Sequence, residues 1–162
     1  MAKVAIIMGS KSDFEVVKPA VNVLKKFGVE TEVRVISAHR TPEEAHEFSS
    51  KAKENGFEAI ICAAGKAAHL GGVFAASTTL PVIGLPVKTD MMGGMDSLLS
   101  IVQMPAGIPV ATVGVNAGEN AGLLAIQMLA IKYPELEKKL VEYKAAMRDK
   151  INADDRALQE ML

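Results

Sequence analysis

The sequence has few aromatic residues and only one cysteine. Among its 162 residues there is no tryptophan, and aromatic residues make up 4% of the chain. Because the single cysteine, Cys62, has no partner within the chain, an internal disulfide is excluded and a reducing compartment is indicated. Both tyrosines, Tyr133 and Tyr143, lie close to the C-terminal end. Neither is placed to stack on a flavin ring at a strand end, which argues against a flavoprotein.

The chain also lacks a strong charge of either sign, a long apolar run and a leader segment. Its 18 basic and 19 acidic residues give a formal net charge of -1, which favours neither nucleic acid nor an anionic membrane as a partner. No apolar run approaches the roughly 18 residues that a membrane span needs. Met1 to Lys3 leads directly into an apolar run, without the parts of a signal peptide. We therefore expect a cytoplasmic protein that binds neither nucleic acid nor membrane.

Short apolar runs alternate with amphipathic segments along most of the chain, which is the pattern of repeated βα units on a parallel sheet. The predicted strands are Val4–Met8, Thr31–Ile36, Ala59–Ala63, Val82–Pro86 and Val110–Val115. Five helices are predicted, and three of them have defined ranges: Asp13–Phe27, Asp96–Gln103 and Glu119–Ala130. Of the other two, one has Thr41 as its N-cap and is closed by Asn55-Gly56, and the next starts near Lys66 to His69. This order predicts an α/β fold with three αβα layers and a doubly wound, flavodoxin-like, five-stranded parallel sheet.

Residues 134–162 follow a different pattern, so we expect one domain overall, with an α/β catalytic domain over residues 1–133 and a C-terminal helical extension over residues 134–162. An apolar stripe runs along a charged helix at Leu136, Leu140, Tyr143 and Met147. The terminal piece, Ile151–Leu162, is also amphipathic. These extra C-terminal helices could fold back on their own sheet. Because no strand follows to cover them, we expect them to pack on a neighbouring subunit.

The loop Gly9-Ser10-Lys11-Ser12-Asp13 follows the first predicted strand and leads into a helix. Free backbone N–H groups at a helix start bind phosphate, and the small and hydroxyl residues of this loop favour that function. Ser12 or Asp13 could instead only cap the helix. The upstream glycine of a Walker loop and the G-x-G-x-x-G of a dinucleotide loop are both missing, so neither a nucleoside triphosphatase nor a dinucleotide site is indicated.

The segment Ser37-Ala38-His39-Arg40-Thr41-Pro42 places a hydroxyl, an imidazole and a guanidinium where the second strand meets its helix. The Arg40 side chain offers a fork for a phosphate or carboxylate, and the polar neighbours of His39 make a core role improbable. By contrast, His46 lies inside the predicted helix among glutamates, and we expect a solvated side chain.

The third and fourth loops are rich in small residues. Ala63 to Gly72 contains His69, which we expect at the helix start facing the sheet edge, although it could merely cap or pack. Cys62, inside the third strand, is interpreted as a buried small hydrophobe. The fourth loop, Lys88 to Ser97, is apolar enough for a lid, and its Asp96 and Ser97 could do nothing beyond capping the next helix.

Other α/β proteins are excluded by what these loops lack. A receiver domain needs an aspartate at the end of the third strand, where this chain has Ala63-Ala64-Gly65. No His, Cys, Asp and Glu cluster has the spacing of metal ligands. The residues therefore predict a small phosphorylated substrate on which a histidine acts, without a redox cofactor or a metal.

Four motifs together resemble the N5-carboxyaminoimidazole ribonucleotide mutases, the class I members of the phosphoribosylaminoimidazole carboxylase family. They are Gly9 to Asp13, Ser37 to Pro42, Ala67 to Leu70 and Asp96 to Pro105, and the resemblance runs from about Lys3 to Tyr133. It implies a flavodoxin-like fold, a homo-octamer and a step of de novo purine (IMP) biosynthesis. In that step a carboxyl group moves from the exocyclic nitrogen of an imidazole ribonucleotide to ring carbon C4. Because the carboxyl group arrives attached, no biotin, ATP or metal is implied.

The resemblance also implies roles for individual residues. His39 becomes the proton shuttle. The implied substrate-binding residues are Ser10, Asp13 and Arg40 as principal contacts, Ser12 and Ser37 as assisting ones, and Gly65, His69 and Leu70 around the base and carboxyl group. Two residues depart from the family pattern: Lys66 stands where many relatives carry glycine, and Gly71 where proline is usual.

Two other functions remain open on the sequence. The first is that of the related class II enzyme, a lyase that carboxylates aminoimidazole ribonucleotide directly with carbon dioxide. The stretch Ala67-Ala68-His69-Leu70 favours the mutase over it. The second is a non-catalytic ribonucleotide-binding module, which would use Ser10, Asp13 and Arg40 and leave His39 dispensable.

Overall fold

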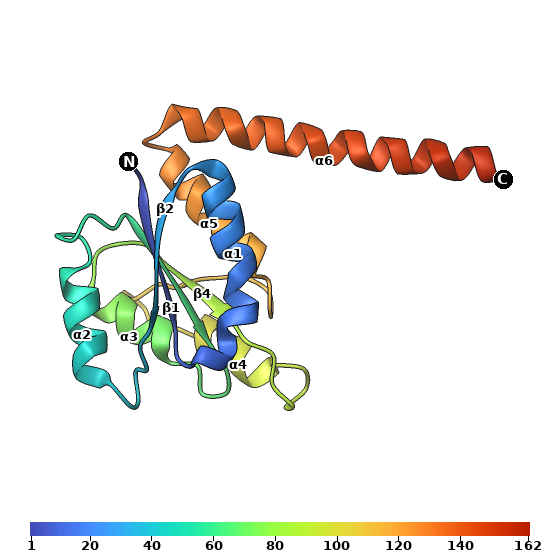
Figure 1. Cartoon of the computed structure of the whole chain (residues 1–162). Helices are drawn as coiled ribbons and strands as arrows, with labels where there is room; N and C mark the ends of the chain where they lie inside the picture. Colours follow the sequence, from blue (N-terminus) through green and yellow to red (C-terminus); the bar gives the residue numbers. More distant parts are fainter.

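Five parallel strands form the centre of the computed structural model, which describes residues 1–162 (Figure 1). Their order across the sheet is β2-β1-β3-β4-β5, and every neighbouring pair is parallel. The strands are β1 Lys3–Met8, β2 Glu30–Val35, β3 Ala59–Ala64, β4 Val82–Pro86 and β5 Ala111–Thr112. The predicted doubly wound, flavodoxin-like sheet is therefore confirmed.

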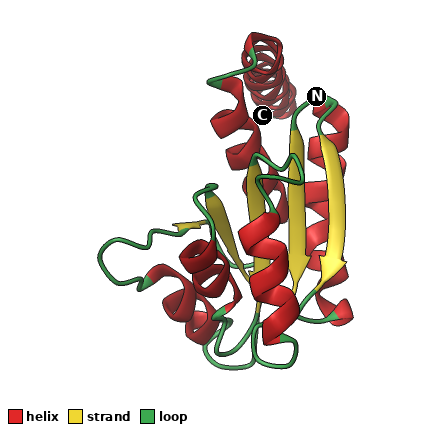
Figure 2. Ribbon diagram, turned by 90° about the vertical axis from the view of Figure 1, so that its left-hand side faces the viewer, coloured by secondary structure: helices red, strands yellow, loops and turns green.

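Helices cover both faces of this sheet, as Figure 2 shows. On one face, α1 (Phe14–Phe27) and α5 (Gly118–Ala130) enclose a core with alternate residues of the central strands, such as Ile6 and Ile61. On the other face lie α2 (Pro42–Lys51), α3 (Leu70–Ser77) and α4 (Met95–Val102), packed on residues such as Ile60. Because β1, β3 and β4 are buried on both faces, they consist almost entirely of apolar residues.

Most predicted boundaries agree with the structure to within one residue, and three elements depart from the prediction most clearly. The strand β5 has two residues instead of six. Beyond it, only isolated backbone hydrogen bonds from the N–H groups of Val113 and Asn116 reach carbonyl groups of β4, and they do not form a regular ladder. The helix α2 ends at Lys51, before Asn55, and the chain then turns through Gly56, whose φ is +83°. The helix α3 begins at Leu70, because Lys66 has a φ of +57° and breaks the helical path ahead of it.

The C-terminal residues form one long helix, α6 (Pro134–Met161), instead of two separate pieces. Leu136 is buried in the chain's own core, and Leu140 and Tyr143 pack against it. These three residues therefore pack within the chain, which is the alternative that the sequence left open, and packing on a neighbouring subunit stays a prediction for the rest of the helix. From Ala146 onward every residue is exposed, and the helix projects away from the body (Figure 1).

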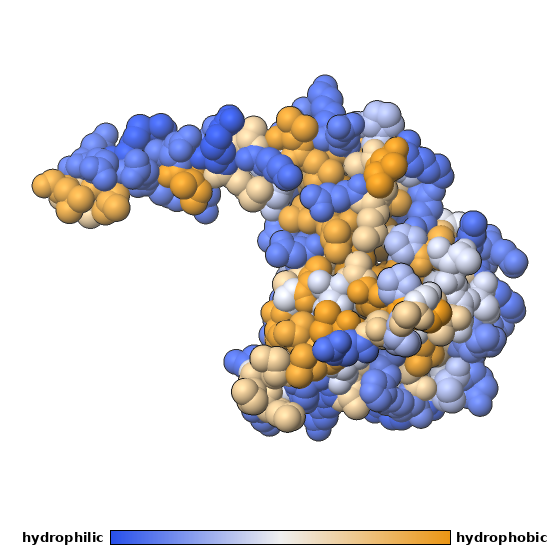
Figure 3. All heavy atoms as spheres, turned by 180° about the vertical axis from the view of Figure 1, so that it is seen from behind, coloured by the Kyte–Doolittle hydropathy of each residue, from blue (hydrophilic) through white to orange (hydrophobic).

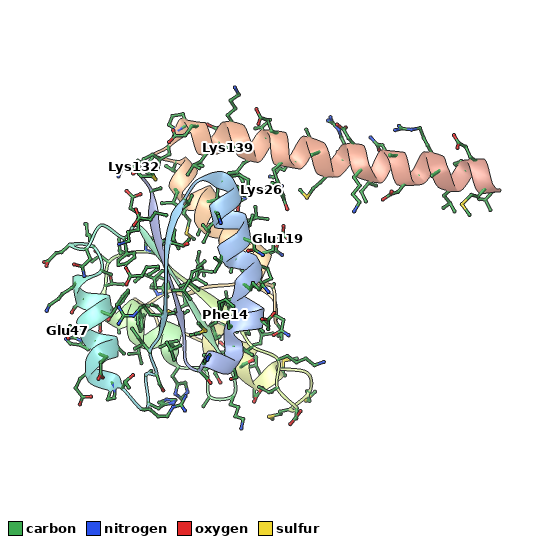
Figure 4. The ribbon with its side chains drawn as sticks, viewed as in Figure 1. Phe14, Lys26, Glu47, Glu119, Lys132 and Lys139 are labelled. Atoms are coloured by element: carbon green, nitrogen blue, oxygen red, sulfur yellow. The ribbon has the colours of Figure 1, made fainter.

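Polar contacts fix the start of α6 on the body. The Lys139 Nζ atom donates to the backbone carbonyl of Phe27 at 2.8 Å, and the Tyr143 hydroxyl donates to Glu119 Oε1 at 2.8 Å. Figure 4 labels Lys139, Lys26 and Glu119 at this junction. As for membranes, no helix here combines the length and the apolar character that a crossing would require.

Glycine allows α1 and α5 to approach closely. A Cβ atom at Gly118 would lie 2.2 Å from the carbonyl oxygen of Val16, and one at Gly122 would lie 2.4 Å from Val23 Cγ1. A backbone carbonyl cannot rotate away as a flexible side chain can. The two helices therefore pack at this distance only while position 118 lacks a side chain.

We expect Gly118→Ala to lower the free energy of unfolding by about 1–3 kcal/mol, because overpacking forces the two helices apart. Urea denaturation measures the effect. Gly114→Ala is the matched control, since its Cβ would meet only Ala117 Cβ at 3.7 Å. Equal midpoints for the two variants would contradict the close approach.

Candidate active site

The loops after β1, β2, β3 and β4 meet at the carboxyl edge of the sheet and enclose a cavity of about 660 Å³. This is where open α/β sheets bind ligands, and the volume suits a small molecule. Of the residues predicted for a site, eight line the cavity: Ser10, Asp13, Ser37, His39, Arg40, Gly65, His69 and Leu70. Ser12 does not.

Ser10 and Asp13 form the wall of the cavity after β1. The Ser12 hydroxyl and backbone N–H both donate to Ser10 Oγ, at 2.9 Å and 3.3 Å, so Ser12 orients Ser10 instead of lining the cavity. Burial raises the pKa of the Asp13 carboxyl above its ordinary value. Hydrogen bonds from Ser10 and Ser12 and the charge of Arg40 oppose that rise. Asp13 is thus a carboxylate held in a partly desolvated position.

Arg40 joins the loops after β1 and β2. Its Nη2 donates to the carbonyl of Gly9 at 2.7 Å, and its Nε donates to Ser37 Oγ at 3.3 Å. Thr41 is the N-cap residue of α2, as predicted, but its side chain makes no capping hydrogen bond. Its hydroxyl accepts from the Ser37 N–H at 2.9 Å and donates to the Ser37 carbonyl at 3.0 Å. The loop is therefore closed on itself, and the guanidinium is held at the cavity.

His39 and His69 meet in the cavity although 30 positions separate them. His39 Nε2 lies 3.0 Å from His69 Nδ1, and the rings stand edge to face with centroids 5.0 Å apart. At this distance one nitrogen must donate and the other accept, so the two atoms share one proton. His39 Nδ1 and His69 Nε2 are left for other partners.

The loops after β3 and β4 form the opposite wall. Gly65 approaches Val87 and Thr89, and a Cβ there would already stand 3.5 Å from Thr89 Cγ2. The Thr89 hydroxyl donates to Asp96 Oδ1 at 2.5 Å, and the buried Ser97 donates to the Val87 carbonyl at 2.7 Å. Asp96 and Ser97 therefore fix this loop, which goes beyond the capping role that the sequence left open.

Sequence reasoning did not select four residues that line this wall: Lys66, Val87, Lys88 and Thr89. The signal was the position of Val87 to Thr89 directly after a buried strand, but only the strand order shows that this strand lies beside β3. The cavity lining holds three cationic side chains, Arg40, Lys66 and Lys88, against the single carboxylate of Asp13. This charge favours an anionic ligand.

Two further residues of reactive types, His46 and Cys62, do not belong to the cavity lining. His46 is exposed on α2, and its Nδ1 lies 3.2 Å from Ser77 Oγ, so the expected solvated position is confirmed. Cys62 is buried in β3, and burial raises the pKa of its thiol. A thiol in this state is a poor nucleophile, which agrees with its interpretation as a small hydrophobe. No three His, Cys, Asp or Glu side chains converge closely enough to hold a metal ion.

Fold and cavity together define a class of protein: a doubly wound α/β protein with a cationic cavity and paired imidazoles at the carboxyl edge of its sheet. A family model described as AIR carboxylase matches residues 3–150, and the chain belongs to this family.

Relatives and solved structures agree with this assignment. A protein of Aquifex aeolicus called N5-carboxyaminoimidazole ribonucleotide mutase is 61% identical to this chain, and the match covers 85% of this chain and 82% of the relative. A protein of the same name in Thermotoga maritima is 50% identical, and that match covers 99% of this chain and 94% of the relative. The crystal structure of Treponema denticola PurE superimposes with a TM-score of 0.90 at 29% identity, covering 98% of this chain and 99% of that one.

The raised pKa of Asp13 gives a pH-dependent prediction. Because the pKa is higher in the folded state, Asp13 contributes stability below its ordinary value of 3.8, and this contribution is lost as the pH rises through the folded-state pKa. Asp13→Asn stays uncharged. Its free energy of unfolding should therefore exceed that of the wild type at pH 7, and the difference should vanish at acidic pH.

Urea denaturation across this pH range measures the difference. The exposed Asp90→Asn is the control and should show no such trend. A variant at Asp13 that is less stable than the wild type at pH 7 would show that the ionised carboxylate is well stabilised.

Proposed function

We propose that this chain is an N5-carboxyaminoimidazole ribonucleotide mutase. It transfers the carboxyl group from the exocyclic nitrogen to ring carbon C4 and gives 4-carboxy-5-aminoimidazole ribonucleotide, a step of de novo purine biosynthesis. One observation carries this proposal: in a member of the AIR carboxylase family, the residues Ser10, Arg40 and His39 line a single cavity. The names of the relatives that are 50–61% identical support the mutase within that family.

The ribonucleotide is bound from the side of β1 and β2. Arg40 and the hydroxyls of Ser10 and Ser37 suit the 5'-phosphate, since a guanidinium forms strong charge-assisted hydrogen bonds with phosphate oxygens. Asp13 accepts hydrogen bonds from the ribose hydroxyls, and Ser12 assists through Ser10. The imidazole ring and its carboxyl group then lie toward the wall of Gly65, His69 and Leu70.

His39 moves the proton that the reaction requires. When it donates a proton to the exocyclic nitrogen, the bond from that nitrogen to the carboxyl carbon breaks and carbon dioxide is released within the cavity. The electron-rich C4 then attacks carbon dioxide, and the new carbon–carbon bond forms. His39 recovers a proton from C4, which restores the aromatic ring and the starting state of the enzyme. Histidine suits both steps because it titrates near neutral pH.

The cavity keeps the released carbon dioxide beside C4 by excluding water and competing nucleophiles. The carboxyl group enters on the substrate and leaves on the product, so the proposed reaction balances without an added oxidant, ATP or second substrate. We also infer a cytoplasmic location, which agrees with the single cysteine of the chain.

The oligomer in this proposal is a homo-octamer that uses the projecting half of α6. Met147, Ile151 and Leu158 continue the stripe that begins with Leu136 and Leu140 on the same face of the helix. Figure 3 shows hydrophobic residues along the underside of this projecting half. A helix of 28 residues is about 42 Å long, and its end has no tertiary contact to stabilise it within one chain. Other copies of the chain would supply that contact.

We expect the intact protein to have eight times the 17.2 kDa mass of one chain in light scattering. Replacing Ile151 and Leu158 by Glu should yield smaller species, because charges on the stripe cannot be buried without partners. Ala153→Glu, on the opposite face of α6, should keep the octamer. An intact protein that runs as a monodisperse monomer would refute this assembly.

The activity itself is tested with the purified protein and both carboxylated ribonucleotides. The wild type should interconvert the N-carboxy and C-carboxy forms without ATP and should carboxylate bare aminoimidazole ribonucleotide poorly at modest bicarbonate. His39→Asn should keep the fold and lower turnover by about 10²–10⁴-fold, as the loss of a general acid and base does.

His46→Asn is the matched control, because this histidine is exposed on α2 and bonded to Ser77, away from the cavity. It should leave turnover unchanged. Near-full activity of the His39→Asn variant would assign the shuttle to His69 instead. If bare aminoimidazole ribonucleotide with carbon dioxide is the better substrate, the protein is the lyase of this family.

A further inference from the structure

Lys66 has a backbone conformation that is unfavourable for its side chain. Its φ is +57°, in the left-handed region, where glycine is favoured and residues with a side chain are uncommon. Two other residues that are not glycine, Met92 and Asn116, also have a positive φ. Asn116 is of a type that tolerates the conformation, and Met92 lies in an exposed loop. Lys66 is the only one of the three that lines the cavity.

The chain around Lys66 is held in place from two sides. Gly65 before it packs near Val87, and the Ser100 hydroxyl of α4 lies 3.4 Å from the Lys66 carbonyl. Both neighbours in sequence, Gly65 and Ala67, also line the cavity. The bend therefore presents a lysine at the rim of a cavity, where glycine would meet the backbone requirement without strain. Strain retained at such a place points to a role in binding.

The cationic residues of the cavity come from loops on different sides of β1. Arg40 is bonded to Gly9 and Ser37, at the ends of β1 and β2. Lys66 follows β3, on the other side of β1 in the sheet. The proposed substrate likewise carries two anionic groups, a phosphate at one end and a carboxylate on the imidazole at the other. With Arg40 assigned to the phosphate, Lys66 and Lys88 remain for the second anion. Lys66 belongs to the wall of Gly65, His69 and Leu70, to which the carboxyl group is assigned, and it follows the strand next to β1, whereas Lys88 follows β4, one strand further away.

We propose that Lys66 is a specificity-determining residue whose ammonium group binds the carboxylate of the carboxylated ribonucleotide. This proposal rests on the proposed function. It means that the cavity distinguishes a carboxylated ligand from the bare aminoimidazole ribonucleotide by charge, in addition to the contacts that all forms of the ligand share.

Three variants at position 66 separate charge from backbone conformation. Lys66→Gly removes the charge and relieves the backbone, Lys66→Asn removes the charge in a residue that tolerates a positive φ, and Lys66→Arg keeps the charge. The matched control is Lys53→Asn, because Lys53 is an exposed lysine outside this cavity. Each is made in the His39→Asn background, so that turnover does not disturb binding measurements.

Calorimetry then measures the dissociation constants of 4-carboxy-5-aminoimidazole ribonucleotide and of bare aminoimidazole ribonucleotide. We expect Lys66→Gly and Lys66→Asn to weaken the first about tenfold, as the loss of a charge-assisted hydrogen bond does, and to leave the second within about twofold. Lys66→Arg and Lys53→Asn should retain both affinities. The urea midpoint of Lys66→Gly should rise, which separates weaker binding from damage to the fold.

Equal weakening of both ligands would show that Lys66 only supports the loop, and unchanged affinity for both would remove it from the site. Either result overturns the proposal while wild-type interconversion of the two carboxylated ribonucleotides leaves the proposed function intact. A wild type that neither interconverts nor binds these ligands would overturn both.

Discussion

The parallel pairing of β1 with both β2 and β3 is the constraint on which the site depends. Because these strands run in one direction, their carboxyl ends lie at one edge of the sheet, and the loops after β2 and β3 flank the end of β1. The helices α2 and α3, which follow those loops, pack side by side on the same face. This brings His39 within 3.0 Å of His69 and allows Arg40 to reach the carbonyl of Gly9.

Two residues of the cavity have locally unfavourable states that the rest of the fold must stabilise. Burial disfavours the ionised form of Asp13, and Lys66 has a positive φ. Asp13 and Lys66 lie in the segments that follow β1 and β3. Nearly all residues of these two strands are buried, and their packing offsets the local costs. Groups of this kind are common at binding sites, because a ligand supplies the missing charge or hydrogen bonds. The same two positions would therefore gain stability and lose binding when substituted.

Sequence patterns were sufficient for the sheet and for most of the cavity. Apolar runs such as Val4–Met8 identify strands because a parallel sheet is buried on both faces, and side chains directly after such runs must lie at its carboxyl edge. That reasoning brought Ser10, His39 and His69 to one place before any coordinates, and the structure puts all three in the cavity. The resemblance to a family supplied their implied chemistry.

The remaining features depend on contacts between distant segments. Arg40 reaches the Gly9 carbonyl, 31 positions away, and His39 meets His69, 30 positions away. The functions of Asp96 and Ser97 are set by Thr89 and Val87 across the loop. The stripe of α6 predicts an apolar face but not its partner: its first half covers the chain's own core and only its second half is free. The spacing of apolar residues predicts that a helix face is buried, but only the tertiary structure shows which surface covers that face.

The central claim is that the cavity holds the migrating carboxyl group until C4 captures it. The most direct test supplies N-carboxy ribonucleotide labelled with ¹³C in its carboxyl group to the wild-type protein in unlabelled bicarbonate. Carbon NMR of the C-carboxy product then reports where the carboxyl carbon came from. The account predicts that the product retains the label. A product that carries mainly unlabelled carbon would mean that the carboxyl group comes from solution, which would contradict transfer within the cavity.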